Sequence, residues 1–169
     1  MVRRAAIALV LALLLLCGAL AAGLRVNGTH SEPLGLYWAI GKQPEKDDLV
    51  FVSPPDTPLF KMAKERGYLN VGYSPTPHLI KRLVGVSGDR VTINARGVEV
   101  NGIRLVNSAS LPFDGAGRPL QFYSLQNYTL GPNEVLLMSD YSSASFDSRY
   151  FGPLPSATLK TVKPLLTWN

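Results

Sequence analysis

Two residues of this chain, Ser31 and Lys81, could together carry out nucleophilic chemistry. Ser31 lies in the turn-rich stretch NGTHSEPLGLYW, residues 27 to 38, a few residues after a long apolar segment. A serine hydroxyl is a weak nucleophile and needs a neighbouring base to take its proton. Turn residues also commonly end an apolar segment, so Ser31 by itself does not establish a catalytic site.

Histidine is the commonest base beside a catalytic serine, and the chain has two histidines. His30 is adjacent to Ser31, and neighbouring side chains of an extended backbone point in opposite directions, so His30 is poorly placed to accept the proton. His78 begins an apolar run, and nothing around it indicates catalysis. The sequence therefore does not favour a Ser-His-Asp triad.

Lys81 is the alternative base. It lies in HLIKRLVGV, residues 78 to 86, where strand alternation puts it on the same face as Leu79 and Leu83 and sends Arg82 to the other face. Burial among aliphatic side chains would lower the pKa of the amine, because desolvation disfavours the ammonium. The same pattern also fits a lysine on a solvated edge strand, with its stem lying along apolar surface.

An uncharged stretch from Ala5 to Leu24 precedes the serine and is long enough to span a membrane as a helix. Arg3 and Arg4 at its start predict a cytoplasmic N-terminus and an external domain. A cleaved signal peptide would have the same charged start, with ALAA at residues 19 to 22 as a cleavage site.

A third interpretation of this segment is lipidation at Cys17, although a bulky leucine precedes that cysteine. We expect an uncleaved membrane anchor over residues 1–26, with residues 5–24 in lipid, and a catalytic domain over residues 27–169. All three interpretations place the domain on the outer side of the membrane.

Short apolar runs separated by turn residues fill the remaining chain. They predict a mainly β domain, a barrel or folded-over sheet. One short helix is expected over residues 58–68. The predicted strands cover residues 48–52, 78–86, 90–94, 98–102, 103–106, 121–130 and 134–139, with loops at 107–120 and 141–148.

Composition excludes several classes of function. The formal charge of +5 comes from dispersed basic residues without a nucleic-acid motif, so it indicates solubility and attraction to anionic lipid rather than nucleic-acid binding. Cys17 is the single cysteine, which excludes an intramolecular disulfide and a cysteine metal site. We expect no metal and no organic cofactor.

Two later segments, HLIKRLVGVSGDRV and SASFDSRYFGPL, resemble conserved boxes of the signal peptidase I family, peptidase S26, which consists of membrane-bound serine proteases. The first box reads Lys-Arg-x-x-Gly-x-x-Gly-Asp from Lys81, and the second reads Asp-Ser-Arg-Tyr-Phe-Gly from Asp147. The family's nucleophile box lies upstream, just past the anchor, where Ser31 is found. The resemblance implies a signal-peptidase-like fold.

Other details resemble the branch of this family that serves conjugative transfer. They are the pattern Asn-x-Thr-x-Ser-x-Pro-x-Gly-x-Tyr from Asn27, the loop PFDGAGRPL at 112–120 and the ending PLLTW at 164–168. This branch implies a pilin precursor as substrate, with head-to-tail cyclisation as a possible second reaction. It also implies a single-pass protein of the bacterial inner membrane with its catalytic domain in the periplasm.

The resemblance implies that Ser31 is the nucleophile and neutral Lys81 its general base. The Ser31 backbone N–H and the Thr29 hydroxyl would be the oxyanion donors. Thr29 could instead make only a local hydroxyl-to-backbone bond.

Three residues of the last box would support this pair. Ser145 occupies the place of a hydroxyl that orients the lysine amine, although it could be one of several solvated serines. Asp147 and Arg149 would form a supporting ion pair, because an Asp147 carboxylate on Lys81 itself would raise the lysine pKa and oppose its use as a base. Ser139-Asp140-Tyr141 departs from the family's Gly-Asp-Asn-Arg and leaves the partner of Asp140 open.

Two other functions remain open at this stage. A general signal peptidase would have the same boxes but different neighbouring genes. A non-enzymatic secretion or assembly factor on the same fold would tolerate replacement of Ser31 and Lys81.

Overall fold

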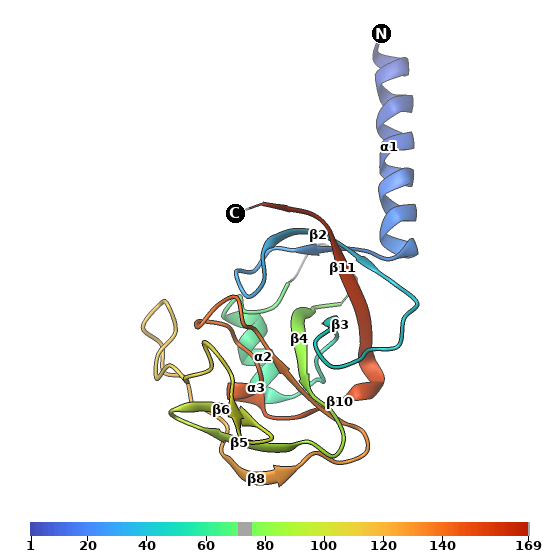
Figure 1. The fold of residues 1–169 in the computed structure, drawn as a ribbon. Helices are drawn as coiled ribbons and strands as arrows, with labels where there is room; N and C mark the ends of the chain where they lie inside the picture. The colour runs from blue at the N-terminus through green and yellow to red at the C-terminus, as the bar shows by residue number, and fades with distance from the viewer. Residues whose placement is uncertain (71–75, 169) are drawn as a thin grey trace.

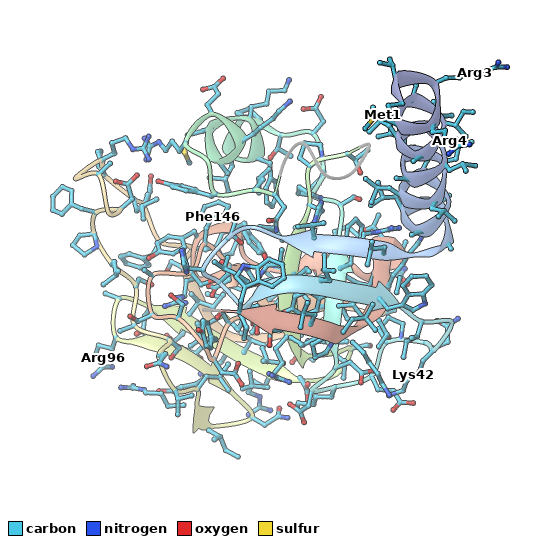
Figure 2. The ribbon with its side chains drawn as sticks, turned by 90° about the horizontal axis from the view of Figure 1, so that it is seen from above. Met1, Arg3, Arg4, Lys42, Arg96 and Phe146 are labelled. Carbon is cyan, nitrogen blue, oxygen red and sulfur yellow. The ribbon has the colours of Figure 1, made fainter. Side chains whose placement is uncertain are left out.

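The computed structural model describes residues 1–70 and 76–168. Helix α1 (Val2–Ala22) extends away from a β-rich domain and buries none of its residues (Figure 1). An 18-residue window of this 21-residue helix has a mean hydropathy of 2.8, and the helix is long and apolar enough to cross a membrane. Arg3 and Arg4 lie on the part of α1 that is remote from the β domain (Figure 2).

The β domain consists of two antiparallel sheets. The four-stranded sheet runs in the order β7 (Ile103–Arg104), β6 (Gly97–Val100), β5 (Arg90–Asn94) and β8 (Leu125–Thr129). The seven-stranded sheet runs β1 (Leu24–Asn27), β2 (Leu34–Ala39), β11 (Leu159–Trp168), β3 (Leu49–Val52), β4 (Leu79–Gly85), β9 (Glu134–Met138) and β10 (Leu154–Pro155). The mainly β prediction with one N-terminal apolar helix is confirmed.

Several element predictions need correction. The strand expected over 121–130 is only β8, because residues 121–124 are exposed and lie outside the sheet. The helix expected over 58–68 ends earlier, as α2 (Pro58–Glu65). Strands β1, β2, β10 and β11 were not predicted, since their residues were interpreted as turn or were left unassigned. The short helices α3 (Ser148–Phe151) and η1 (Ser156–Thr158) complete the fold.

Strand β4 is buried on both faces and runs through the middle of the core. Leu79 and Leu83 belong to a cluster with α2, α3 and the neighbouring strands. Ile80 packs on the opposite face with Tyr37 and Phe51. Lys81 therefore points to the side of Leu79 and Leu83, as the alternation predicted.

Candidate active site

Ser31 lies in the tight connection between β1 and β2, which pair antiparallel up to Asn27 and Gly35. The buried Asn27 side chain holds this connection from inside. Its amide nitrogen Nδ2 donates to the carbonyl oxygens of Thr29, Glu32 and Pro33 at 3.1, 2.9 and 3.0 Å. Because one amide satisfies three turn carbonyls, the backbone around Ser31 has little freedom to move.

Residues from distant parts of the chain hold the same turn. Asn70 donates from Nδ2 to Asn27 Oδ1 at 3.1 Å, and its own Oδ1 accepts from the Gly28 N–H at 2.6 Å. The Tyr37 hydroxyl donates to the Pro33 carbonyl at 2.7 Å. Ser31 itself is 8% exposed.

Lys81 is the candidate base, and its side chain is completely buried at 0% exposure. Its Nζ donates to the Ile80 carbonyl at 3.2 Å. Among residues 1–70 and 76–168, no carboxylate lies within 4.0 Å of this nitrogen. Burial lowers the pKa of Lys81 to about 8, although the nearby Asp147 and Glu32 carboxylates act against this and raise it.

Ser139 connects the Ser31 turn to the lysine strand. Arg82 of β4 pairs with Met138 of β9, so Lys81 and Ser139 are the next residues along the two antiparallel strands. The Ser139 hydroxyl donates to the Ser31 carbonyl. In the sequence Ser139 stands out only as a departure from the family pattern, and no local signal could have revealed this contact.

Asp147 and Arg149 form a bidentate ion pair with both side chains fully buried. Arg149 donates from Nε to Asp147 Oδ1 at 2.8 Å and from Nη2 to Oδ2 at 2.7 Å. Arg149 also donates to loop carbonyls of Asn107, Ala109, Ser142 and Ser143. Asp147 Oδ2 further accepts from the Ser139 N–H at 3.1 Å, so the pair joins these loops to the end of β9.

The two predicted hydroxyl helpers differ in their present contacts. Ser145 is 2% exposed, and its hydroxyl has no hydrogen-bond partner in the part of the chain that the structure describes. Thr29 donates its hydroxyl to Asn27 Oδ1 at 3.1 Å, so this hydroxyl would have to turn before it could serve an oxyanion. Among the described residues, a new partner of the Ser145 hydroxyl would therefore displace no hydrogen bond, whereas a new partner of the Thr29 hydroxyl would displace its bond to Asn27.

Neither histidine is arranged as a base for Ser31. His78 is buried and stacks on Phe51, with ring centroids 4.6 Å apart. Its ring nitrogens lie 3.4 and 3.3 Å from the carbonyl oxygens of Thr76 and Val26, and burial lowers its pKa. His30 is exposed.

Asp140, whose partner the sequence left open, lies 2.9 Å from the Arg82 guanidinium. This ion pair keeps both charges at the rim of the site. Arg82 also donates to the Asp47 carbonyl at 2.8 Å, which fixes the guanidinium on the outer face of β4.

A pocket of about 180 Å³ opens beside Ser31. Loop 111–120 forms one wall, which is held by Asp114 through hydrogen bonds from the Tyr68 hydroxyl and from Arg118. A small apolar side chain of a bound peptide would fit this space. Apart from Ser31 and its neighbours, the lining includes Leu111, Phe113, Leu120, Ala144, Phe146 and Tyr150.

Comparisons with known proteins agree on one family. The model of the family described as signal peptidase, peptidase S26, matches residues 1–168. A plasmid transfer protein TraF from Escherichia coli is 48% identical over 165 residues, covering 96% of this chain and 93% of the relative. A probable conjugal transfer protein TraF from Sinorhizobium fredii is 41% identical over 140 residues, covering 80% and 72%. A signal peptidase I structure from Enterococcus faecalis aligns with a TM-score of 0.41 at 20% identity, covering 72% of this chain and 97% of the other.

Proposed function

Because the chain belongs to the signal peptidase family, peptidase S26, we propose that it is a membrane-anchored serine endopeptidase with Ser31 as nucleophile and Lys81 as general base. The observation that carries this proposal is the setting of Lys81. Lys81 is fully buried, has a pKa of about 8, and has no carboxylate within 4.0 Å of its amine among the described residues. It lies on the strand next to Ser139, which holds the Ser31 turn. Such an amine is neutral often enough near pH 7 to accept a serine proton.

The proposed reaction proceeds through an acyl-enzyme. Neutral Lys81 takes the hydroxyl proton while Ser31 Oγ attacks the substrate carbonyl, and the Ser31 N–H and the Thr29 hydroxyl stabilise the oxyanion. Lys81 then gives its proton to the leaving amine as the peptide bond breaks. Ser145 orients the lysine amine during both transfers, and the Asp147–Arg149 pair holds the surrounding loops.

The proposed substrate is a pilin precursor used in conjugative transfer. The named relatives are plasmid and conjugal transfer proteins, which supports this assignment over a general signal peptidase. Water attacking the acyl-enzyme would release a linear product. The substrate's own N-terminal amine attacking the same ester would close a ring, and we propose this as the second reaction available to the site.

We further propose that residues 5–24 anchor the protein in the bacterial inner membrane, with residues 27–169 as the catalytic domain on the periplasmic side. The apolar helix α1 with Arg3 and Arg4 near its start supports this orientation. The anchor would keep the site close to substrates that emerge from the membrane.

The test is co-expression of the full chain with candidate pilin precursors, followed by intact-mass measurement of the products. Ser31→Ala and Lys81→Ala should each abolish processing, whereas the exposed-site controls Ser124→Ala and Lys160→Ala should retain it. A product lighter by one water than the linear peptide would establish ring closure. Processing that survives Ser31→Ala or Lys81→Ala would refute the proposed dyad.

A further inference from the structure

Glu32, the residue after the proposed nucleophile, has an unusual environment for an acidic side chain. It is 2% exposed, and its Oε1 has no hydrogen-bond partner among the residues that the structure describes. A buried carboxylate oxygen without a partner is rare in folded proteins and calls for a specific explanation.

The Glu32 side chain lies apart from the Ser31 pocket. Glu32 lines a second cavity of about 410 Å³, which also includes Tyr37, Arg82 and Asp140. This cavity shares no lining residue with the pocket beside Ser31. The neighbours of Glu32 in the core therefore indicate what its carboxyl group can affect.

The buried charges of the core identify that residue. The buried Asp, Glu, Lys and Arg side chains of the described chain are Glu32, Lys81, Asp147 and Arg149. Asp147 and Arg149 satisfy each other at 2.7 Å. Glu32 and Lys81 are left without an ion pair within 4.0 Å in the described ranges. Ser139 brings them near each other, because it lies opposite Lys81 across β4 and β9 and donates to the carbonyl of Ser31, the residue before Glu32. Each also affects the pKa of the other.

Other charged or titratable groups also face Glu32. Arg82 from β4 and Asp140 after β9 pair with each other at 2.9 Å, so their effects on Glu32 largely cancel. Asp147, before α3, is neutralised by its arginine, and Tyr37 from β2 stays protonated because burial raises its pKa to about 12. Tyr141 lies at the same cavity. Lys81 is thus the main unbalanced charge near the Glu32 carboxyl.

Glu32 and Lys81 change charge within a narrow pH range. Burial raises the pKa of Glu32 to about 7, and burial lowers the pKa of Lys81 to about 8. An ionised Glu32 favours the ammonium form of Lys81, so it raises the lysine pKa. Above pH 7 the carboxylate is mostly ionised, which is where Lys81 loses its proton.

We propose that Glu32 is a positioning residue for the Lys81 base: its buried carboxylate holds a proton on the lysine amine and so sets the pH above which the amine can activate Ser31. This inference rests on the proposed function. It predicts that a neutral residue at position 32 shifts the working range of the site to lower pH.

The test follows the titration of the Lys81 amine by NMR, which needs no substrate. The full chain in detergent micelles carries lysine labelled with 13C at Cε, and the resonance that disappears in Lys81→Ala is that of Lys81. Its chemical shift against pH reports the protonation of this amine. Glu32→Gln keeps the side-chain shape without charge and should move the titration midpoint of Lys81 about one pH unit lower. That shift corresponds to a neutral fraction of Lys81 up to about tenfold higher below the midpoint.

Three comparisons make the result specific to the charge at position 32. Glu32→Asp keeps the charge and should leave the Lys81 midpoint near its parent value, and the remote control Glu99→Gln should not move it. Glu32→Met provides a second neutral variant, and thermal unfolding shows which variants fold.

An unmoved Lys81 midpoint in the folded neutral variants would overturn the inference. A larger shift for Glu32→Asp than for Glu32→Gln would also overturn it, because that pattern indicates a role for shape. Failure of the dyad itself would be seen separately, as processing that survives Lys81→Ala.

Discussion

Replacing Lys81 by methionine should abolish processing and, at neutral pH, make the protein more stable. The folded protein holds this amine at 0% exposure, where burial lowers its pKa from 10.5 to about 8. The unfolded chain keeps the ordinary pKa and binds a proton more tightly. Folding therefore works against protonation of Lys81 at every pH below 10.5, and methionine fills similar space without that cost.

The size and pH dependence follow from the two pKa values. A depression of about 2.5 pH units at about 1.36 kcal/mol per unit corresponds to about 3 kcal/mol. The full penalty applies below pH 8, decreases between pH 8 and 10.5, and disappears above 10.5. For a chain of this size, about 3 kcal/mol raises the unfolding temperature by about 6–12 °C.

Thermal unfolding of the full chain in detergent micelles, at pH 7 and at the alkaline limit, would measure this difference. The matched control is Lys160→Met, because that lysine is exposed on β11 and its loss should change stability by less than about 0.5 kcal/mol. A Lys81→Met protein that unfolds at a lower temperature at pH 7 would refute the reasoning. It would mean that the ammonium is well satisfied in the folded state and that Lys81 is a structural residue.

Two further substitutions test the surroundings of the dyad. Arg149→Met leaves the Asp147 carboxylate buried and unpaired, which should lower the free energy of unfolding by about 3–5 kcal/mol and raise the pH needed for processing. Adding Asp147→Asn should recover part of this stability in thermal unfolding. An Arg149→Met protein as stable as the parent would contradict the buried pair. Asn27→Asp replaces the amide donor to three carbonyls by an acceptor, so processing should fall and stability should decrease by about 1–3 kcal/mol, whereas exposed Asn133→Asp should do neither. Normal processing by folded Asn27→Asp would show that the turn does not depend on that amide.

Local pattern predicted the parts of the fold in which local chemistry decides the outcome. The alternation around Lys81 gave its strand and the face it occupies, since β4 lies in a sheet with apolar material on both sides. The hairpin of β5 and β6 followed from alternating residues around a glycine-containing turn. The apolar helix was evident from length and hydropathy alone.

The strands next to the candidate nucleophile could not be predicted in the same way. β1 and β2 are short and flank the turn-rich residues 28–33, and β2 is fixed in the sheet because β11 from the far end of the chain pairs with it. Pro164 interrupts the local β signal of β11, and the pairing with β2 shifts register just beyond it. The contacts of Asn70 and Ser139 with the Ser31 turn span 42 and 108 residues along the chain, so no local window contains both partners.

The surroundings of the basic side chains explain why lysine rather than histidine would be the base. Both carbonyl contacts of His78 engage ring nitrogens, and its ring stacks on Phe51, so proton transfer at His78 would disturb packing between β4, β3 and β1. Arg149 cannot lose its proton and is already paired with Asp147. Lys81 is buried, has no carboxylate within 4.0 Å of its amine in the described chain, and makes a hydrogen bond to the neighbouring Ile80 carbonyl. A lysine base needs a dry environment to lower its pKa and an open hydrogen-bonding position to receive a proton, and of these three side chains only Lys81 has both.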